Sequence, residues 1–597
     1  MIMTPTKPLY VLGTGLSHDG SVCLLKDGEI SVAIEKERIT RSKHDGGNDS
    51  VAIAYVLEAA GITLSDVALV VQNAYSGMLK FNDSWYEGKR PFKGEVPVLT
   101  ISHHLAHAYS VFATSPFEES TILVIDGCGN SFDDCLDLEN TAIPEVPLGE
   151  MAPLWNEKDS YYKTAGTKVA PLFKDFSPWG TGIKGYPMHP PTTRHSIGGV
   201  YGAASKYVFR GLEDPGKLMG LAPYGRPGAF DHQVFDLRDG RAFVRYDWME
   251  NFRTPAHSHE DFKAGFQHYA DLAYGIQREV ERAVLYIANA RYALSPHDNL
   301  CYSGGVALNA VANRRLLTEG PFRNVHITPA AGDNGLALGC AYYGYYEVLK
   351  QEKKRPSGSV YFGKSYEPSE IETTLQRYSQ LVNFTPSNSP VADAVSYLVD
   401  GKVVGWFQGG SEFGPRALGN RSILADPRIG GIRDHINAKV KFREDFRPFA
   451  PSVLAQDCAT YFDCDYPSPH MLLTAPVRAQ WRDTIPAIVH LDQSARIQTV
   501  TRDSNPRFYE LLEGFKRATG IGAVLNTSLN RRGMPIVETP DDALMLFIYT
   551  GIEVLVMGDY IVSKPADFES RMAAFSTMVA QQTARKTLAM ALKSANP

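Results

Sequence analysis

Apolar runs alternate with glycine-bearing turns at the start of the chain, and this pattern predicts a small β-sheet. An apolar run at 10–12 leads into a stretch of small and polar residues, 13–20. The next apolar runs, 21–25 and 29–34, flank an Asp-Gly step. Because Asp-Gly accepts the positive φ of a tight turn, these runs are predicted to form a hairpin. A strand, a small-residue loop and a hairpin in this order suit a sheet whose loop faces a ligand.

Two periodicities alternate along the rest of the chain. Apolar residues at helical spacing predict helices over 50–60, about 262–292 and 336–350, and an alanine-rich helical tail is predicted over 567–597. Short apolar runs predict strands over 67–71, 96–101, 121–126, 300–302 and 402–408. From about 140 to 195 the chain has little periodicity and is rich in proline, glycine and aromatic residues. That segment is predicted to be a functional loop, such as a lid or an acceptor pocket, although its aromatic residues can equally pack a long excursion.

The length of the chain requires more than one hydrophobic core. With 597 residues it is expected to form two or more domains. A polar run containing proline, glycine and serine at 351–359 marks the predicted boundary. We expect a first domain over 1–355, a linker over 356–390, a second domain over 391–566 and the tail over 567–597.

Composition and charge argue against several classes of protein. A net charge of -6 disfavours general nucleic-acid binding, which requires a basic surface. The seven cysteines are scattered and never form a Cys-x-x-Cys pair, which is typical of a reducing cytoplasm. The start of the chain has no apolar leader, and the apolar run 544–558 is too short to cross a membrane. We therefore expect a cytoplasmic protein that binds neither nucleic acid nor membrane.

The candidate chemistry gathers around a histidine-rich helix start. Ser102 stands where an N-cap is expected, and His103 and His107 are four apart, so their imidazoles share one face of the helix. Asp126 ends the next buried strand, and Asp333 lies in a second glycine-flanked turn. Two imidazoles and two carboxylates form a suitable ligand set for a divalent metal.

The same residue types also have plainer interpretations. A histidine pair at this spacing is often only packed, and His104 is expected to pack or to support its neighbours. His18 and Asp19 can orient or deprotonate a hydroxyl, although such a pair is more often a turn hydrogen bond. The helix start at 196–202 offers free amides to an anion, and the glycine turn at 303–309 is a second place where backbone can approach a nucleotide. The segment 213–220 places one lysine between glycines, which suits a phosphate but is also common in ordinary turns.

A cationic segment in apolar surroundings characterises the second half. Between residues 416 and 447, eight basic side chains stand against four acidic ones, among phenylalanine and proline. Because an unpaired buried cation is costly, a phosphate or triphosphate is the natural partner. Arg496 lies in an apolar strand, and the segment 524–530 adds hydroxyl and amide groups. The alternative is an internal network of salt bridges.

Taken in order, these motifs resemble the NodU/CmcH family of O-carbamoyltransferases. The resemblance covers nearly the whole chain and rests on His18-Asp19, 35–44, 103–108, Asp126-Gly127, 217–223, 303–309, Gly332-Asp333, 412–419, 441–451 and 526–530. It implies an α/β fold, with an N-terminal actin/hexokinase-like domain of ribonuclease-H type and a C-terminal YrdC-like domain. The region 140–195 departs from the family pattern.

The resemblance also implies a reaction in two steps. In the second domain, carbamoyl phosphate and ATP, with Mg²⁺, give carbamoyl adenylate, while phosphate and pyrophosphate leave. In the first domain, a hydroxyl of a small natural product takes the carbamoyl group, and AMP leaves.

The resemblance assigns roles to named residues. The predicted metal ligands, which resemble an iron(II) site, are His103, His107, Asp126 and Asp333. The predicted carbamoyl phosphate and ATP groups are Arg416, Lys441, Arg443, Arg447, Arg496, Asn526 and Ser528. Predicted catalytic residues are Lys441, Arg447, Arg496 and His18. The predicted acceptor pocket contains His18, Asp19 and Lys43, and the predicted nucleotide-binding residues of the first domain are Gly127, Lys217, Gly304, Gly305 and Asn309.

Other functions fit the sequence less well. A sugar-kinase-like ATPase of the same N-terminal fold has no need of the arginine-rich second half. The net acidity counts against a tRNA-modifying protein, and two separate polar sites count against a non-catalytic binding module. A metallopeptidase is rejected because no glutamate lies between the histidines. The acceptor and the oligomeric state, for which a homodimer is one candidate, cannot be read from the sequence.

Overall fold

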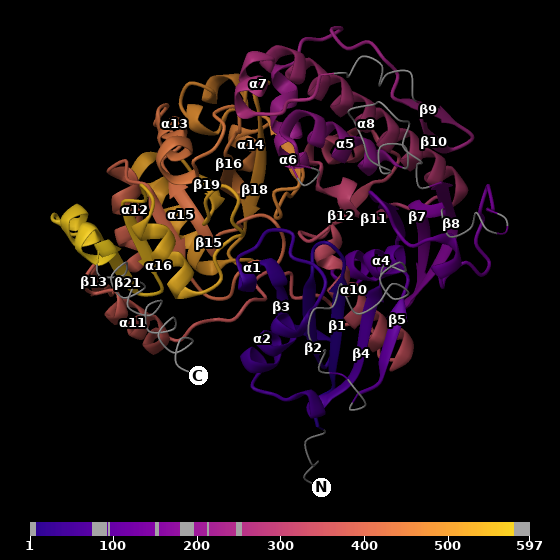
Figure 1. Ribbon diagram of the computed structural model, residues 1–597, viewed down its shortest axis with the longest axis horizontal. Coiled ribbons are helices and arrows are strands. Elements are labelled where there is room, and N and C mark those ends of the chain that lie inside the picture. The colour runs from indigo at the N-terminus through magenta and orange to yellow at the C-terminus, as the bar shows by residue number, and fades with distance from the viewer. Residues whose placement is uncertain are drawn as a thin grey trace, which may run out of the picture.

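Two five-stranded sheets of the same topology form the first half of the molecule (Figure 1). The computed structural model describes residues 7–74, 92, 96–147, 149, 155–178, 196–211, 214–245 and 254–577. The first sheet contains β1 (Tyr10–Leu16), β2 (Ser21–Lys26), β3 (Glu29–Glu35), β4 (Val67–Ala74) and β5 (Val98–Ile101), in the order β3-β2-β1-β4-β5. Strand β1 is antiparallel to β2 and parallel to β4, so the predicted hairpin is confirmed as β2 and β3.

The second sheet repeats this pattern. It contains β6 (Thr121–Ile125), β7 (Trp155–Ala165), β8 (Lys168–Pro178), β11 (Asn299–Ser303) and β12 (Asn324–Ile327), in the order β12-β11-β6-β7-β8. Strand β6 is antiparallel to β7 and parallel to β11, as β1 is to β2 and β4. A hairpin continued by parallel strands, present twice, confirms the predicted α/β class and the duplicated ribonuclease-H-like architecture of the first half.

The long hairpin of β7 and β8 corrects the prediction of a loop over 140–195. Residues 155–178 form two eleven-residue strands. Most side chains of β7 are buried, including a consecutive polar run from Asn156 to Ser160. The prediction was wrong because these polar residues are paired inside the protein and do not face water. Residues 150–154 and 179–195 lie outside the described residues.

Helices fill the space between and around the two sheets. Between them lie α4 (His103–Ala113) and α10 (Leu336–Tyr343), and around them lie α1 (Lys36–Thr40), α2 (Ser50–Ala60), α5 (Ile197–Phe209), α6 (Pro215–Leu221), α7 (His259–Ala264), α8 (Phe266–Leu294) and α9 (Ala310–Glu319). A small hairpin consists of β9 (Phe235–Arg238) and β10 (Arg241–Val244). Helix α10 crosses α4 so closely that a Cβ added at Gly339 would lie 1.7 Å from the carbonyl oxygen of Ala106. The predicted helix 336–350 becomes a π-helical turn from Gly344, and the predicted 262–292 helix is divided at Gly265.

A nine-stranded mixed sheet forms the second half. Its strands are β13 (Asn383–Pro386), β14 (Val404–Phe407), β15 (Arg421–Ala425), β16 (Ala450–Leu454), β17 (Leu473–Pro476), β18 (Ser494–Val500), β19 (Ala523–Ser528), β20 (Val554–Met557) and β21 (Tyr560–Ser563). Its helices are α11 (Pro368–Arg377), α12 (Pro390–Val399), α13 (Ile432–Ile436), α14 (Cys458–Tyr461), α15 (Pro506–Thr519) and α16 (Pro540–Ile548). The predicted linker 356–390 contains α11 and β13, and β13 pairs with β21. Residues 568–577 are helical, and the rest of the predicted tail lies outside the described residues.

The two halves are packed against each other, as Figure 1 shows for the orange and yellow second half beside the magenta and indigo first half. The ring of Phe446, from the second half, is buried in the aromatic core of the first half. It lies 5.8 Å from the ring of Phe262 and 6.0 Å from the ring of Phe209. Both candidate sites lie near this junction. None of the helices in the described part of the chain combines the length and apolar composition needed to cross a bilayer.

Candidate active site

Four side chains from separate elements converge on one buried point in the first half. His103 and His107 lie at the start of α4, Asp126 follows β6, and Asp333 precedes α10. The Nε2 atom of His103 lies 3.0 Å from Asp126 Oδ2, 3.2 Å from His107 Nε2 and 3.4 Å from Asp333 Oδ1. One ligand atom from each residue lies within 4.8 Å of all the others. The four predicted ligands are therefore brought together with two nitrogens and two oxygens facing one point, a set that can hold a divalent metal.

The electrostatics of this cluster favour a positive charge at its centre. Burial by itself would lower the pKa of His103, but Asp333 and Asp126 outweigh burial and raise it to about 10. Burial by itself would raise the pKa of Asp333, but His103 and His18 hold it well below its ordinary value. Two buried carboxylates repel each other unless a cation lies between them. The positive charge between the carboxylates can come either from protons on the imidazoles or from a bound divalent ion.

Backbone contacts fix the histidines and aspartates in place. Ser102 has the extended conformation of an N-cap, but its hydroxyl accepts the amide of Leu136. The predicted N-cap position of Ser102 is therefore confirmed, but its side chain caps no amide of the helix. The amide of His103 instead donates to Asn130 Oδ1 at 2.6 Å. On the other side, Asp126 Oδ1 accepts the amide of Gly305 at 2.7 Å.

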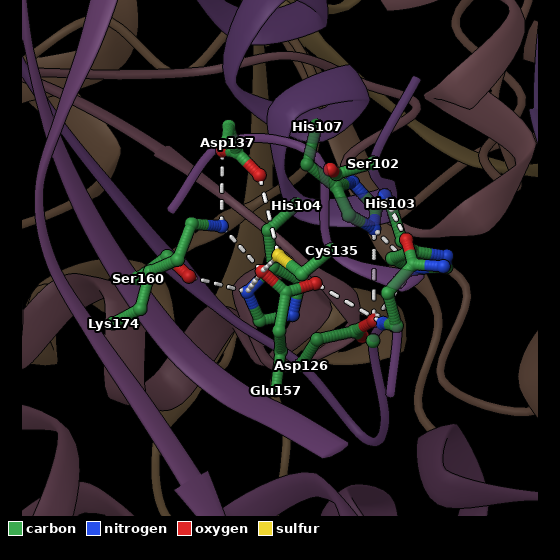
Figure 2. A network of polar contacts seen from close by, with 12 residues as sticks. Ser102, His103, His104, His107, Asp126, Cys135, Asp137, Glu157, Ser160 and Lys174 are labelled. Carbon is green, nitrogen blue, oxygen red and sulfur yellow. Dashed lines mark hydrogen bonds and ion pairs between the residues drawn. The ribbon is translucent and has the colours of Figure 1, made fainter. Parts of the chain in front are cut away.

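A second polar network lies directly beside this cluster, to the left of His103 and Asp126 in Figure 2. Cys135, Asp137 and Glu157 present a sulfur and two carboxylates at metal-binding distances. However, the ammonium of Lys174 contacts Glu157 Oε1 and lies 3.0 Å from Asp137 Oδ2. The lysine thus provides the positive charge that these ligands require. His104 points into this network, with Nδ1 2.7 Å from the hydroxyl of Ser160, which agrees with its predicted supporting role.

The network supports the metal cluster through one loop. Glu157 Oε2 accepts the amide of Asn130, whose side chain in turn holds the amide of His103. Burial lowers the pKa of His104 to about 4, so its imidazole is neutral at physiological pH. Sequence reasoning missed Glu157 and Lys174 because both lie in the segment interpreted as a loop. The sequence offers no direct signal for them, because their burial and pairing become visible only in the structure.

The predicted acceptor residues lie at the edge of the cluster. His18 is half exposed, and its Nδ1 lies 3.2 Å from Asp333 Oδ2. Its Nε2 lies 3.5 Å from Asp19 Oδ2, and Asp19 Oδ1 contacts His44 Nδ1 at 2.7 Å. The structure thus brings His18 and Asp19 to the metal cluster. It places Lys43 elsewhere, on the wall of a second cavity.

That second cavity, of about 220 Å³, lies at the junction of the two halves. Its predicted lining residues are Arg416, Lys441, Arg443, Arg447, Arg496, Asn526 and Ser528, all from the second half. The first half contributes Lys43, Gly216 and Gly220. The ammonium of Lys441 donates to the carbonyl of Ser528 at 2.5 Å and to Asn530 Oδ1 at 2.8 Å. The structure therefore gathers all seven predicted phosphate-binding residues around one cavity.

The cations of this cavity lack matching negative charge. Burial, Arg416, Arg443 and Arg447 together lower the pKa of Arg496 well below its ordinary value. Burial and Arg447 lower the pKa of Arg416 to about 10. Because the charges acting on Arg416 and Arg496 are cationic, an internal salt-bridge network does not explain this cavity. A bound polyanion would supply the negative charge that the side chains around the cavity do not provide.

Other basic residues of the same segment do form internal partnerships. Arg428 makes a two-pronged contact with Asp426, with bonds of 2.6 to 3.0 Å. Arg421 donates to the carbonyls of Gln408 and Gly409 and lies 3.7 Å above the ring of Phe407. The sequence pattern does not distinguish these structural arginines from those that line the cavity.

The residues predicted to bind nucleotide in the first half have structural partners. Lys217 pairs with Asp214 at 2.7 Å, and Asn309 caps α9 through the amide of Ala312. The Gly127 carbonyl accepts the hydroxyl of Ser196, and the amide of Gly305 holds the carboxylate of Asp126. Gly304 has a φ of +94°, and a Cβ there would lie 2.3 Å from the carbonyl oxygen of Ile125. A nucleotide role for these residues stays a prediction.

Comparison with known proteins agrees with this two-part arrangement. The family model for the carbamoyltransferase N-terminus matches residues 11–91 and 70–342, and the model for the carbamoyltransferase C-terminus matches residues 395–564. The nodulation protein NolNO of Sinorhizobium fredii is 34% identical over 593 residues, which covers 93% of this chain and 81% of that protein. Nodulation protein U of Bradyrhizobium diazoefficiens is 28% identical over 561 residues, which covers 88% of this chain and 92% of that protein.

Similarity to solved structures is more distant. The crystal structure of T. kodakarensis HypF shows 16% identity and a TM-score of 0.35, and the match covers 58% of this chain and 49% of that one. The two family models together span both halves and both candidate sites, and the nodulation relatives align over most of their own lengths. The chain therefore belongs to the carbamoyltransferase family and is a transferase enzyme.

Proposed function

We propose that the protein is an ATP-dependent O-carbamoyltransferase that works in two steps at two sites. In the cationic cavity, carbamoyl phosphate, ATP and one water give carbamoyl adenylate, phosphate and pyrophosphate. At the histidine and aspartate cluster, a hydroxyl of a small natural product attacks the carbamoyl carbon, and AMP leaves. The observation that carries the proposal is the cavity itself, where buried cations lie together without enough acidic partners.

The cavity suits chemistry on phosphorylated substrates. The guanidinium groups of Arg416, Arg443, Arg447 and Arg496, with the ammonium of Lys441, can bind several phosphate oxygens at once. Charge moves onto the leaving pyrophosphate during adenylate formation, and fixed cations stabilise this charge in the transition state. Arg447 and Arg496 are proposed to bind the phosphates. Lys441, held by Ser528 and Asn530, is proposed to contact the reacting oxygen.

The first-half cluster suits the transfer step. His103, His107, Asp126 and Asp333 would hold a divalent metal, for which we propose iron(II), and its chemistry would be that of a Lewis acid on the carbamoyl oxygen. Asp19 and Asp333 orient His18 from two sides. We propose that His18 takes the proton of the acceptor hydroxyl as it attacks.

The products of ATP turnover test the proposal. The purified enzyme is incubated with carbamoyl phosphate, ATP and Mg²⁺, and nucleotides and phosphates are quantified. We expect pyrophosphate and phosphate in equal amounts, each dependent on carbamoyl phosphate, with carbamoyl adenylate as the nucleotide product and AMP in its place once an acceptor is added or the adenylate hydrolyses. Formation of ADP would favour a kinase, and turnover dependent on tRNA would favour a tRNA-modifying enzyme. A panel of acceptor alcohols, with products measured by mass spectrometry, then identifies the acceptor by its added carbamoyl group.

A further inference from the structure

One backbone unit of the second half is held between two charged side chains of the first half. The amide of Gly414 donates to Glu35 Oε1 at 2.6 Å, and the carbonyl of Gly414 accepts from Arg38 at 2.5 Å. Glu35 ends β3, and Arg38 lies in α1, one turn further along. Their own ion pair joins Arg38 Nε to Glu35 Oε2 at 2.9 Å. We name Glu35, Arg38 and Gly414 the clamp.

The clamp is buried and its charges are shared between the halves. Arg38 is only 1% exposed and Glu35 is 4% exposed. Besides Glu35, the acidic side chains that act on Arg38 include Glu412 and Glu538 from the second half. A buried guanidinium in such surroundings loses much of its stabilisation if the two halves separate or shift. The clamp therefore favours one relative position of the halves over others.

On one side the clamp touches the loop that carries Asp333. Asn334 donates from its side chain to Glu35 Oε1 at 3.3 Å. Gly414 has a φ of +126°, and a Cβ there would lie 2.9 Å from the carbonyl oxygen of Pro329. Any residue other than glycine would therefore push this backbone away from the segment that leads to Asp333.

On the other side the clamp leads into the cationic cavity. Pro415 and Arg416 follow Gly414 directly and line the cavity. The same loop is fixed internally, because Glu412 Oε1 accepts the amides of Leu418, Asn420 and Arg421. The loop is held together by its own hydrogen bonds and is attached to the first half at Gly414. Its contacts with Glu35 and Arg38 therefore fix its position relative to the first half.

We propose that Glu35 and Arg38 are positioning residues that hold Arg416 and its loop in place, so that the anion site depends on an ion pair that does not line the cavity. The inference rests on the proposed function, because it assigns the cavity to a polyanion. The clamp contacts both the Asp333 loop and the Arg416 loop. It thereby fixes the distance between the two proposed reaction sites.

The test measures binding of inorganic pyrophosphate to the full-length protein by calorimetry. Arg38→Met removes the ion pair and the bond to Gly414, and Gly414→Ala displaces the backbone. We expect each change to raise the pyrophosphate Kd by about tenfold or more. Glu35→Gln keeps an oxygen for the Gly414 amide but removes the charge facing Arg38, so we expect a smaller rise in Kd. It also serves as the test variant if Arg38→Met does not fold.

Tyr55→Phe is the matched control. It removes two other bonds of the Tyr55 hydroxyl, the 2.5 Å contact with Glu538 and the bond accepted from the amide of Lys364, but leaves the bonds of the clamp in place. We expect its pyrophosphate Kd to stay close to that of the wild type, even if its melting temperature falls. Clamp variants that fold and bind pyrophosphate as tightly as Tyr55→Phe would overturn the inference alone. A wild-type protein that binds no pyrophosphate would overturn both the inference and the proposed function.

Discussion

At the scale of single residues, the two sites have opposite electrostatic demands. The first-half cluster places two carboxylates and two imidazoles around one point, and its carboxylates require a positive charge between them. The cavity at the junction places buried cations together, and the acidic groups beside them, Asp492 and Glu444, are too few to match them. Each imbalance is unfavourable in the unliganded protein and is relieved by the ligand that we propose for it.

Removing a cavity cation is expected to abolish the first step. Lys441→Ala or Arg447→Ala should eliminate carbamoyl-phosphate-dependent formation of AMP and pyrophosphate, because each change removes a charge that would stabilise the leaving phosphates. Nucleotide chromatography provides the measurement. Arg428→Ala is the matched control from the same basic segment, since Arg428 pairs with Asp426 and does not line the cavity. Full activity in Lys441→Ala would exclude the cavity as the site of adenylate formation.

Anion binding in the cavity is expected to weaken in alkaline solution. Burial, Arg443, Arg447 and Lys43 lower the pKa of Lys441 well below its ordinary value in the empty cavity. A bound polyanion favours the protonated form, so binding raises this pKa and takes up a proton. The pyrophosphate affinity should therefore fall as the pH rises through the lowered pKa of Lys441. Calorimetry at one alkaline pH in buffers of different ionisation enthalpy should show proton uptake, and identical heats would contradict this linkage.

Removing a predicted metal ligand is expected to separate the two steps. His107→Ala should leave formation of carbamoyl adenylate and pyrophosphate partly intact, because the cavity is a separate site. It should stop carbamoyl transfer to the acceptor and lower the amount of metal that copurifies, as measured by elemental analysis. Equal loss of both steps, with the fold intact, would contradict the division between the sites.

At the scale of elements, close helix packing sets the geometry of the metal cluster. Helix α4 carries both histidines, and α10 follows Asp333 directly. The contact at Gly339 and Ala106 brings the two helices together. The long hairpin of β7 and β8 supports α4 from behind through Glu157, Lys174 and His104. The geometry of the cluster therefore depends on packing contacts of residues that are not themselves metal ligands.

Gly339→Ala is expected to damage the cluster from a distance. Its Cβ would lie 1.7 Å from the Ala106 carbonyl oxygen, so α10 must move away from α4. Such overpacking typically costs about 1–3 kcal/mol, and thermal unfolding should show a lower midpoint. Metal retention should fall as well, because the helices carry ligands on both sides of the cluster. Gly431→Ala is the control, since a Cβ there meets open space.

Parts of this arrangement could be predicted from the sequence, and other parts could not. The spacing of His103 and His107, and the Asp-Gly turn of the first hairpin, depend on local periodicity, which a sequence displays directly. The hairpin of β7 and β8 was missed because its polar residues are buried and paired across strands. The placement of Lys43 in the cavity could not be derived, because it depends on how two distant segments pack.

At the scale of the whole molecule, the junction between the halves is part of the site. The cavity draws Lys43, Gly216 and Gly220 from the first half and its arginines from the second. Phe446, three residues from Arg443 and one from Arg447, is buried among aromatic rings of the first half. The cationic segment is therefore attached to the first half by apolar contacts as well as by the clamp.

Phe446→Ala is expected to loosen that attachment. Loss of a buried phenylalanine typically costs about 3–5 kcal/mol, and here the loss falls on the junction. We expect calorimetric unfolding of the variant to broaden or split, because the halves lose part of the contact that couples them. Phe446→Leu should restore most of the wild-type profile. A single sharp transition at the wild-type temperature in Phe446→Ala would show that this ring does not couple the halves.

Lys174 has a consequence for how the enzyme responds to its surroundings. The histidine and aspartate cluster and the neighbouring Cys135 network both offer possible metal ligands, but the backbone holds the ammonium of Lys174 inside the second. A tethered group has an effective concentration that a dissolved ion at trace levels does not match. Changes in the supply of trace metals should therefore alter metal occupancy only at the histidine and aspartate cluster. The thiol beside the lysine should stay out of reach of soft, toxic ions that compete for sulfur.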